Sequence, residues 1–577
     1  MSNKSFSDVE RIKTASHHLR GTLVESLANN ITGAIADDDT QLSKFHGTYM
    51  QDDRDSRGER KRRRLEPDYS FMIRARLPGG ICTPEQWLAV DALSDEYANS
   101  SIRLTTRQAF QFHGVIKREL KATIQGINQT LLDTIAACGD VNRNVMCSPN
   151  PHLSTAHQQV HKWADKISAH LTPQTQAYHE IWLDGEKLTP EPEVVEPIYG
   201  DTYLPRKFKT GVVIPPQNDI DVYTQDLGYI AVIENSQLVG FNVTAGGGMG
   251  STHGDVTTFP RLADVLGFCR PEQVLDVAEA VVTTQRDFGD RTDRKHARLK
   301  YTIETHGVDW FRGEVERRQG FKFEAARDIT LRGTGDRLGW TQGEDGLWHF
   351  TVFIDSGRVN DQAKPGRRLK SGLAAIAKVH RGEFRLSPNQ NMVIANIDST
   401  QKAKIEALLI KYDMHAPVSA LTSHAMACVA LPTCGLAMAE AERYLPDFVG
   451  RVESLMRSHG VEEQPVVLRI TGCPNGCARP FVAEIGLVGK GPGRYNLYLG
   501  GGHSGERLNK LYAENVDERQ ILDALDPLFE RYALERDSEG QSGYEPFGDF
   551  LVRTGEIKAT SSGSNFHDDT HAHGGDV

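Results

Sequence analysis

Short apolar runs, separated by glycine, proline and charged residues, dominate the chain from residue 69 onward. FMIRARLPGG (71–80) predicts a strand that ends in a turn. SIRLTTRQAFQFHGV (101–115) predicts a long strand, because apolar and polar residues alternate with a period of two. Between these segments, PEQWLAVDALSDEY (84–97) has helical spacing. Strands that alternate with helices in this way indicate an α/β or α+β chain.

Two pairs of segments indicate a diverged internal repeat. SIRLTTRQAFQFHGV (101–115) aligns without gaps with EFRLSPNQNMVIANI (383–397), and GFNVTAGGGMGSTHG (240–254) is similar to RYNLYLGGGHSGERL (494–508). Each match alone is weak, but their shared order favours duplication of a two-domain unit. We therefore expect an α+β, multi-domain fold with a pseudo-twofold internal duplication.

The composition is that of a soluble globular protein. At about 150 residues per domain, 577 residues predict roughly four domains. Hydrophobic residues make up 39% of the chain, and the net charge of −11 excludes a general polyanion-binding role while leaving room for local basic faces. The longest uncharged, mostly apolar stretch, 425–439, is too short to span a bilayer, and the N-terminus lacks the apolar core of a signal peptide. We expect a cytoplasmic protein with reduced thiols.

Both ends of the chain are polar. Residues 1–65 are charge-dense, and six of the eight residues in 57–64 are basic, which indicates either a solvated helix or a docking surface. Residues 560–577 are rich in Ser, Gly, Asp and His, and we expect a disordered tail. The polarity of this tail explains His567, His571 and His573 better than metal binding does.

Four of the eight cysteines form two close pairs. Cys428 and Cys434 have the spacing C-x5-C, and Cys473 and Cys477 have the spacing C-x3-C within GCPNGC. Four thiolates brought together suit a soft metal centre, either zinc or an iron–sulfur cluster, and spacing alone does not separate the two. The alternative is that they are small core residues, which is the default for the unpaired Cys82, Cys138, Cys147 and Cys269.

Several predicted strands carry basic side chains on one face. Residues two apart on a strand share a face, so Arg74 lies with Arg76, and Lys207 with Lys209. These faces, with Arg143, could converge on a multi-anionic ligand, although a solvated face is the alternative for any one strand. Nucleic acid is a competing polyanion, but no nucleic-acid-binding motif is present. The polar face of 101–115 consists of Arg103, Thr105, Arg107, Gln111 and His113.

A glycine loop follows one of the repeated segments. Gly246–Gly248 and Gly250 could approach a phosphate or a cofactor edge. The loop does not match the GxGxxG fingerprint, and no P-loop consensus appears. Nicotinamide binding within this chain is therefore unsupported.

Together these motifs resemble the sulfite and nitrite reductase family, the siroheme and 4Fe-4S enzymes. The resemblance extends from about residue 10 to about residue 555, and C-x5-C followed by C-x3-C is its most specific feature. LSKFHGTYMQDDRD (42–55) is similar to the sulfite-reducing branch that works with a flavoprotein. The other segments that carry it are RARLPGG (74–80), SIRLTTRQAFQFHG (101–114), NRNV (142–145), YLPRKFKTGVVIPP (203–216) and GCPNGCARP (472–480).

The resemblance implies two metal cofactors. One 4Fe-4S cluster is held by Cys428, Cys434, Cys473 and Cys477, and Cys477 is also the axial ligand of one siroheme iron. Siroheme carries eight carboxylates, and the residues implied to hold it are Arg103, Arg107, Gln111, Arg206, Lys300 and Asn475. The residues implied to form the substrate pocket are Arg76, Arg143, Lys207 and Lys209.

The implied activity is the six-electron reduction of sulfite to hydrogen sulfide, in sulfate assimilation and cysteine biosynthesis. The arginines stabilise the sulfite oxygens and the lysines supply protons. Electrons come from NADPH through a separate flavoprotein (alpha) subunit with FAD and FMN, in a hetero-oligomer, and residues 1–65 are the expected docking element. Neither nucleic acid nor a membrane is an expected partner. The rivals are a ferredoxin-dependent sulfite or nitrite reductase and a zinc-stabilised nucleic-acid-binding protein.

The expected domains follow the repeat and the resemblance. Two ferredoxin-like half-domains and two larger α/β domains surround a central cofactor site. The N-terminal extension and the tail lie outside these four domains. The expected ranges are 1–65 for the extension, 66–150 and 336–425 for the half-domains, 151–335 for the repeat domain without a cluster, 426–558 for the repeat domain with the cluster, and 559–577 for the tail.

Overall fold

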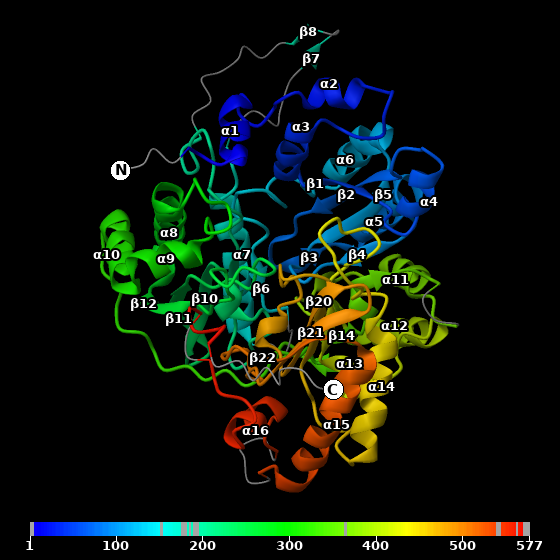
Figure 1. The fold of residues 1–577 in the computed structure, drawn as a ribbon. Coiled ribbons are helices and arrows are strands. Elements are labelled where there is room, and N and C mark those ends of the chain that lie inside the picture. The colour runs from blue at the N-terminus through cyan, green and yellow to red at the C-terminus, as the bar shows by residue number, and fades with distance from the viewer. Residues whose placement is uncertain are drawn as a thin grey trace.

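The computed structural model contains four five-stranded sheets that form two related pairs (Figure 1). It describes residues 5–149, 154–174, 182–183, 186–187, 196–362, 366–537, 544–560 and 563–568. A further two-stranded sheet pairs β7 (Trp182–Leu183) with β8 (Glu186–Lys187). Within these ranges, no helix combines the length and the apolar character that a bilayer crossing requires.

Two of the large sheets are antiparallel and exchange an edge strand. Their strand orders are β1-β2-β5-β4-β15 and β13-β14-β17-β16-β3. β3 belongs to the first half of the sequence but pairs with β16, whereas β15 belongs to the second half but pairs with β4. One hydrophobic core, which includes Trp87 and Phe384, therefore spans both sheets. The strands are β1 (Thr48–Asp52), β2 (Tyr69–Ala75), β3 (Ile81–Cys82), β4 (Ile102–Leu104), β5 (Phe110–Val115), β13 (Gly339–Gln342), β14 (Trp348–Val352), β15 (Arg358–Val359), β16 (Glu383–Leu386) and β17 (Met392–Ile397).

The other two sheets share a mixed topology. Their strand orders are β6-β9-β10-β11-β12 and β18-β19-β20-β21-β22. In both, the first three strands are parallel and the last two are joined by antiparallel pairing. The strands are β6 (Met146–Cys147), β9 (Thr210–Val213), β10 (Leu227–Glu234), β11 (Gln237–Ala245), β12 (Asp264–Cys269), β18 (Ala425–Ala427), β19 (Leu468–Thr471), β20 (Ile485–Gly491), β21 (Arg494–Leu499) and β22 (Lys510–Val516).

These matching topologies confirm the duplication and the α+β fold predicted from the sequence. The aligned segments 101–115 and 383–397 form the equivalent hairpins β4–β5 and β16–β17, so the single long strand predicted over 101–115 is wrong, because a turn at 105–109 divides it. β11 and β21 occupy equivalent places in the mixed sheets, and each ends directly before a glycine triplet, at 246–248 and 500–502.

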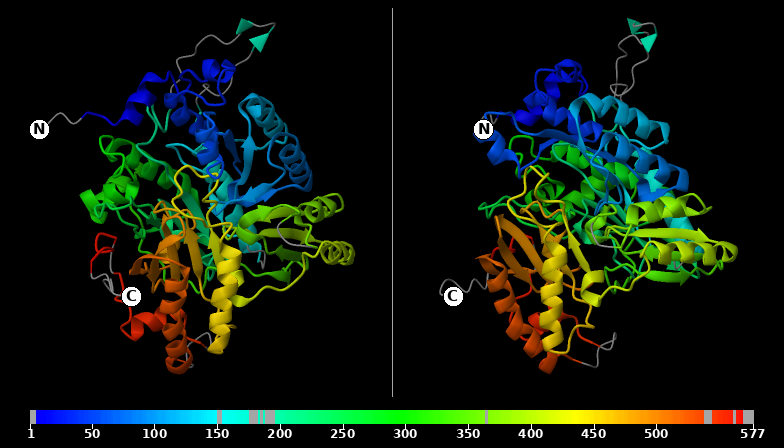
Figure 2. Two further views of the ribbon diagram at one scale, coloured as in Figure 1. Left: turned by 45° about the vertical axis from the view of Figure 1, so that its right-hand side comes forward. Right: turned by 90° about the vertical axis from the view of Figure 1, so that its right-hand side faces the viewer.

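Helices cover the sheets, and local sequence explains where several begin. α5 (Pro84–Tyr97) starts with proline at its first position and a capping box between Thr83 and Gln86. α14 (Leu445–Ser458) and α15 (Glu518–Glu535) lie side by side at the end of the molecule opposite α2 (Figure 2). The other helices are α1 (Asp8–Ala15), α2 (Leu23–Ala28), α3 (Asp37–Leu42), α4 (Arg57–Arg62), α6 (Leu120–Gln129), α7 (Thr155–His170), α8 (Val274–Phe288), α9 (Leu299–His306), α10 (Val308–Gln319), α11 (Leu369–Ala377), α12 (Ser399–Lys411), α13 (Ala420–Ser423) and α16 (Phe547–Arg553).

The N-terminal segment is built into this fold. β1 is the edge strand beside β2, so the domain boundary expected at residue 65 separates two paired strands. In α1, Lys13 is buried, with its Nζ 2.5 Å from Glu10 Oε1 and 2.8 Å from the carbonyl oxygen of Leu204. Residues 5–65 are therefore not a detachable docking arm.

Part of the tail is also packed, which corrects the expectation of disorder for residues 563–568. Phe566 is 2% exposed and contacts Phe481 and Tyr498 in a small apolar cluster. Lys510 Nζ donates to the carbonyl oxygen of Asp568 at 2.6 Å, and His567 Nε2 lies 3.0 Å from the carbonyl oxygen of Thr258. His571 and His573 lie outside the described residues.

Candidate cofactor and anion site

The paired cysteines meet at the carboxyl ends of two adjacent parallel strands. Cys428 directly follows β18, and Cys473 follows β19, which pairs with β18. Cys473 and Cys477 are joined by a turn in which Gly476 has φ +63°, a conformation that favours glycine. Because parallel strands end at the same edge of a sheet, two pairs that are distant in the sequence come together here.

The thiols of these four cysteines are close enough for Cys477 to change the pKa of the other three. Burial, and then the neighbouring Cys477, raises the pKa of Cys473 to about 11. Burial and Cys477 likewise raise the pKa of Cys428 and of Cys434. A cationic metal centre reverses this preference, because it binds the thiolate form.

The surroundings of the thiols fit an iron–sulfur cluster. The N–H of Gly472 donates to Cys428 Sγ at 3.3 Å, and Asn475 Nδ2 donates to Cys473 Sγ at 3.4 Å. In the described part of the chain, no three His, Cys, Asp or Glu side chains converge closely enough to hold one ion. Soft thiolate donors that also accept N–H hydrogen bonds are those that a 4Fe-4S cluster takes, so these four side chains fit that group.

A group of cations lies beside the cysteines; we call Arg143, Arg206, Lys207 and Lys209 the cation group. Two backbone hydrogen bonds, from Phe208 N–H to Val141 at 3.1 Å and from Arg143 N–H to Phe208 at 3.0 Å, hold the two segments together. Burial, followed by the charges of neighbouring cations, lowers the pKa of Lys209 to about 7 and that of Arg206 to about 10. The same causes hold the pKa of Lys207 well below its usual value.

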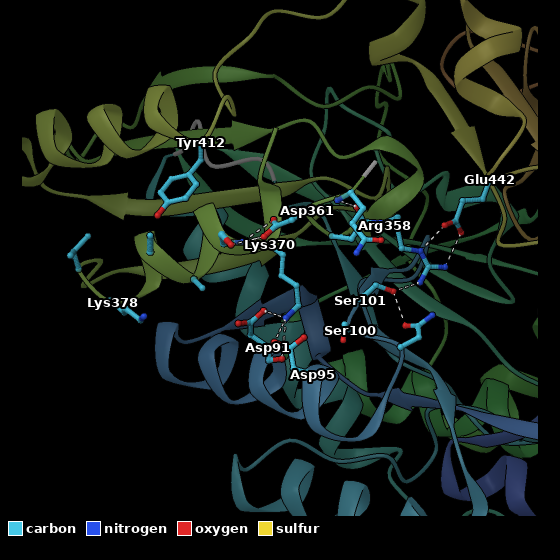
Figure 3. A pocket seen from close by; sticks show the side chains of 17 residues that line it. Asp91, Asp95, Ser100, Ser101, Arg358, Asp361, Lys370, Lys378, Tyr412 and Glu442 are labelled. Carbon is cyan, nitrogen blue, oxygen red and sulfur yellow. Dashed lines mark hydrogen bonds and ion pairs between the residues drawn. The ribbon is translucent and has the colours of Figure 1, made fainter. Parts of the chain in front are cut away.

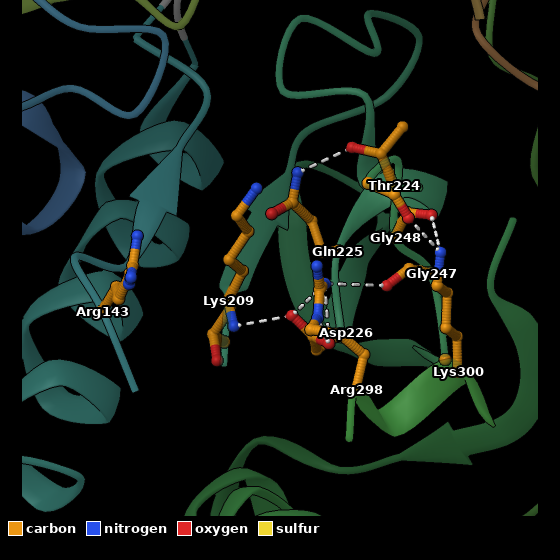
Figure 4. A network of polar contacts seen from close by, with 12 residues as sticks. Arg143, Lys209, Thr224, Gln225, Asp226, Gly247, Gly248, Arg298 and Lys300 are labelled. Atoms are coloured by element: carbon orange, nitrogen blue, oxygen red, sulfur yellow. Dashed lines mark hydrogen bonds and ion pairs between the residues drawn. The ribbon is translucent and has the colours of Figure 1, made fainter. Parts of the chain in front are cut away.

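Three members of the cation group lack a counter-ion within ion-pairing distance among the described residues. The side-chain nitrogens of Arg206, Lys207 and Lys209 make no hydrogen bond or ion pair with any described residue. Arg298, in contrast, pairs with Asp226 at 2.8 Å, and only the backbone N–H of Lys209 reaches that carboxylate (Figure 4). Half-buried cations that repel one another and lack partners fit a polyanionic ligand. Siroheme, with its carboxylates, and a small oxyanion both satisfy this requirement.

The structure corrects the expected position of Arg76. β2 ends at Ala75, and the backbone of Arg76 bridges to Asp133, so the shared face with Arg74 does not continue. The guanidinium of Arg76 lies 3.2 Å from Ser168 Oγ and 3.3 Å from Asp133 Oδ2, away from the cation group. Arg74 instead donates to Cys138 Sγ at 3.1 Å.

Two residues that were expected to bind siroheme, Arg103 and Lys300, make their hydrogen bonds to other groups of the protein. Arg103 pairs with Glu442 at 2.8 Å, and its Nη2 donates at 3.0 Å to the carbonyl of Ala427, the residue before Cys428. Lys300 Nζ donates to Gly250 O at 2.7 Å and to Gly248 O at 3.2 Å, so it fixes the glycine loop. Both residues hold backbone near the site in place.

Among the other residues expected to bind siroheme, Arg107 and Gln111 differ in how many of their polar atoms already have hydrogen-bond partners. Arg107 donates to Gln225 Oε1 at 2.9 Å and to Thr210 O at 2.7 Å, but its Nε has no partner. Burial, and then Arg143, lowers the pKa of Arg107 to about 9. Gln111 Nε2 contacts only the sulfur of Met72, at 3.4 Å.

The glycine loop packs against the cysteine turn. Ser251 N–H donates to the carbonyl of Pro474 at 3.0 Å, and a side chain at Gly250 would meet Asn475 at 3.4 Å. A side chain at Gly247 would lie 2.2 Å from the carbonyl oxygen of Tyr223. The Ser251–Pro474 hydrogen bond thus joins the two repeat domains at the cysteine turn, while Gly247 lets the loop lie close to Tyr223 of its own repeat domain.

Sequence reasoning missed two residues that the N-terminal segment adds to the site. Tyr49, in β1, has its hydroxyl 3.5 Å from Arg143 Nη2. Lys44 is close to Arg294, Asp140 and Arg206, and burial followed by Arg294 lowers its pKa to about 8. Both lie in LSKFHGTYMQDDRD (42–55), a segment in which the sequence indicated no site residue.

A second cavity, of about 920 Å³, lies between α5 and α11 and is lined by no cysteine among the described residues (Figure 3). Two of its cations are paired with carboxylates. Lys370 Nζ lies 2.7 Å from Asp95 Oδ2, and Arg358 Nε lies 2.6 Å from Glu442 Oε1. This cavity therefore has fewer unpaired positive charges to bind an anion than the cation group has.

Comparison with known proteins places the duplicated fold in a class. A model described as the nitrite and sulphite reductase 4Fe-4S domain matches residues 162–323, and one described as the nitrite/sulfite reductase ferredoxin-like half domain matches residues 63–129 and 341–412. The chain thus has the architecture of nitrite and sulfite reductases. The four paired cysteines lie outside the first match, within which Cys269 is the only cysteine.

Relatives that match nearly the full length of the chain identify the family within this class. The chain is 59% identical over 556 residues to the sulfite reductase [NADPH] hemoprotein beta-component of Myxococcus xanthus (strain DK1622), which covers 96% of this chain and 97% of that protein. It is 58% identical over 571 residues to the protein of the same name from Shewanella sp. (strain MR-4), covering 98% and 100%. The chain therefore belongs to the family of sulfite reductase hemoprotein beta-components, which confirms the resemblance found in the sequence.

A solved structure supports the fold. The structure of Mycobacterium tuberculosis NirA protein matches with a TM-score of 0.75 and covers 95% of this chain and 96% of that chain. Its sequence identity is 24%, so this likeness concerns the fold alone.

Proposed function

We propose that the chain catalyses the six-electron reduction of sulfite to hydrogen sulfide. The observation that carries the proposal is the group of half-buried cations, three of them unpaired among the described residues, beside four facing thiols. The cations match an oxyanion substrate and a polycarboxylate cofactor, and the thiols match a 4Fe-4S cluster. Sulfite is the substrate in the names of the relatives that are 58–59% identical to this chain.

The site residues divide into two sets. Siroheme and the cluster, when bound, supply single electrons to the substrate sulfur. The thiolates of Cys428, Cys434, Cys473 and Cys477 would hold the cluster, and Cys477 would also bind siroheme. Arg107, Arg206 and Asn475 retain free donors or lie at the cysteine turn, which supports a role in holding siroheme.

The cations hold the substrate and move protons. Arg143, with Arg74 in the place expected for Arg76, offers planar forks that suit sulfite oxygens. A lysine whose pKa is about 7 gives up a proton readily near neutral pH, so Lys209 is suited to protonate an oxygen that leaves as water. Lys207 shares this role, because an anionic ligand offsets the repulsion that lowers its pKa.

The visible absorption spectrum of the purified protein, with iron analysis, tests this function. A strong porphyrin-type band that shifts when sulfite is added supports siroheme with sulfite bound at its iron. A folded protein from cofactor-sufficient cells that is colourless and free of iron would overturn the proposal and favour a zinc-stabilised protein.

We also infer a separate electron donor, a flavoprotein that oxidises NADPH. The relatives are named as the beta-component of an NADPH enzyme, which supports this partner. On α4 and just after it, Lys61, Arg62 and Arg64 are exposed and unpaired among the described residues, and they offer a basic face to it. Deleting residues 1–65 does not test docking, because β1 belongs to the fold.

A charge-reversal variant tests this donor instead. Lys61→Glu with Arg62→Glu should lower NADPH-flavoprotein-driven turnover at least about tenfold and leave dye-driven turnover unchanged, because charge pairs steer association. Lys404→Glu with Lys411→Glu, on α12, is the matched control. If reduced ferredoxin supports turnover and the flavoprotein does not, the donor assignment is wrong.

A further inference from the structure

Arg54, two residues after β1, contacts the loop that carries Cys434. Its backbone N–H donates to the carbonyl of Pro432 at 3.1 Å. Its Nη1 donates to the carbonyls of Cys434 at 3.2 Å, Gly435 at 3.3 Å and Ala437 at 3.1 Å. One residue thus holds four carbonyls of a short segment, residues 430–437, which we call the cluster loop.

The cluster loop has little internal support. Leu436 is 69% exposed, and Gly435 is exposed beside it. Two backbone hydrogen bonds lie within the loop, from Cys434 to Ala430 at 2.9 Å and from Ala437 to Cys434 at 3.1 Å. An exposed segment with few internal hydrogen bonds opens easily unless another part of the chain fastens it.

The charge of Arg54 is not cancelled by a carboxylate. Asp52 pairs with Arg57 at 2.6 Å, and Asp55 pairs with Arg443 at 2.7 Å. Among the described residues, no carboxylate pairs with Arg54. A full positive charge therefore lies against the backbone of the loop that carries Cys434, a thiol that is expected to hold iron.

We propose that Arg54 is a positioning residue that fastens the cluster loop to the first antiparallel sheet and raises the reduction potential of the cluster. The second part rests on the proposed function. A cation near a cluster held by thiolates stabilises the reduced, more negative state, because the net charge around a cluster sets its potential. Without it, the cluster accepts electrons less readily.

Three variants separate fastening from charge. Arg54→Lys keeps the charge but loses the guanidinium geometry, whereas Arg54→Gln loses both. Arg57→Gln removes a charge three residues away that contacts Asp52 and not the loop, so it is the matched control. Each is made in the full chain as purified. The readouts are amide hydrogen exchange of the peptide 430–438 and the cluster potential from a redox titration followed by electron paramagnetic resonance.

Both Arg54 variants should exchange the amides of Cys434 and Ala437 about tenfold faster, which corresponds to roughly one lost charge-assisted hydrogen bond. The potential should become more negative in Arg54→Gln and stay near the wild-type value in Arg54→Lys. Wild-type exchange in both variants would overturn fastening, and an equal shift in Arg57→Gln would overturn the charge effect. A preparation without iron would refute the proposed function, while exchange would still decide whether Arg54 fastens the loop.

Discussion

Lys209 illustrates how folding sets the chemistry of a single residue. An isolated lysine is protonated far above neutral pH, but burial and the nearby cations Arg298 and Arg107 lower the pKa of Lys209 to about 7. The same crowding leaves its Nζ without a partner among the described residues. A lysine in this state both attracts an oxyanion and releases a proton near neutral pH, so its environment makes it suitable for catalysis.

Replacing Lys209 by Met should lower sulfite turnover by about 100-fold or more, because it removes a proton donor and a positive charge from the pocket. The visible spectrum and the iron content should not change, since Lys209 holds neither cofactor. Sulfide production with a dye donor measures the effect. Wild-type turnover in Lys209→Met would remove Lys209 from the mechanism.

The same substitution should stabilise the chain when it is produced without siroheme. Because the folded pKa is about 7 and the unfolded value is near 10.5, the unfolded state binds more protons between these pH values. The cost of Lys209 to stability is therefore greatest below pH 7 and disappears above about pH 10.5. Thermal unfolding should show a higher Tm for Lys209→Met at pH 7 and a smaller gain at pH 9. Lys121→Met, at an exposed position, should show no such trend.

Between elements, α7 and the second antiparallel sheet share a cavity that is lined by neutral histidines. His157 and His161 on α7 and His349 on β14 line a cavity of about 280 Å³ with Arg385 of β16. Burial, and then Arg385, lowers the pKa of His157 to about 4 and that of His161 to about 3. The same causes lower the pKa of His349 to about 4. Protonation at this junction would place new charges beside Arg385.

Stability should therefore fall as the pH drops from about 6.5 to about 4. In this pH range the histidines bind protons in the unfolded state and not in the folded state, so the unfolded state is stabilised relative to the folded state. In urea unfolding at several pH values, the free energy of unfolding should depend less on pH for the double variant His161→Gln with His349→Gln than for the wild type. His415→Gln, at an exposed position, should keep the wild-type slope. Equal slopes in all three proteins would contradict the assignment to the α7–β14 junction.

At the scale of the whole molecule, buried charge joins the two repeat domains. Asp221, before β10, is completely buried and pairs with Arg469 of β19 at 2.7 Å. It also contacts Arg479, which follows the cysteine turn and donates to the carbonyl of Thr106 at 3.0 Å. One carboxylate thus connects both repeat domains and the first ferredoxin-like half at the candidate site. The exchange of β3 and β15 between the antiparallel sheets links the halves a second time.

Asp221→Asn should destabilise the protein by about 3–5 kcal/mol, because it leaves two buried guanidiniums without a countercharge. The substitution should also reduce the amount of bound iron, since Arg479 lies two residues after Cys477. Denaturant unfolding and iron analysis measure the two effects. Asp523→Asn, in an exposed pair with Arg519, should change neither. An Asp221 variant as stable as the wild type would show that the domains are joined by other contacts.

Much of this protein was determined by its sequence. The periodic segments 101–115 and 383–397 predicted the duplication, because local alternation and turn residues act over short distances. The two cysteine pairs and the basic segments likewise identified the parts of the chain that meet at the site. The family followed from these motifs and was confirmed by full-length relatives.

Only the tertiary structure decided which side chains are free to act. Arg76 is directed to Asp133 and Ser168, Arg103 to Glu442, and Lys300 to the glycine loop, while Lys207 and Lys209 remain unpaired among the described residues. Arg103 and Glu442 are 339 positions apart, so no local pattern predicts their pairing. The charge and direction of a side chain depend on partners that folding brings from elsewhere in the chain. For this reason the sequence indicated the chemistry of the site, whereas the tertiary structure determined its geometry.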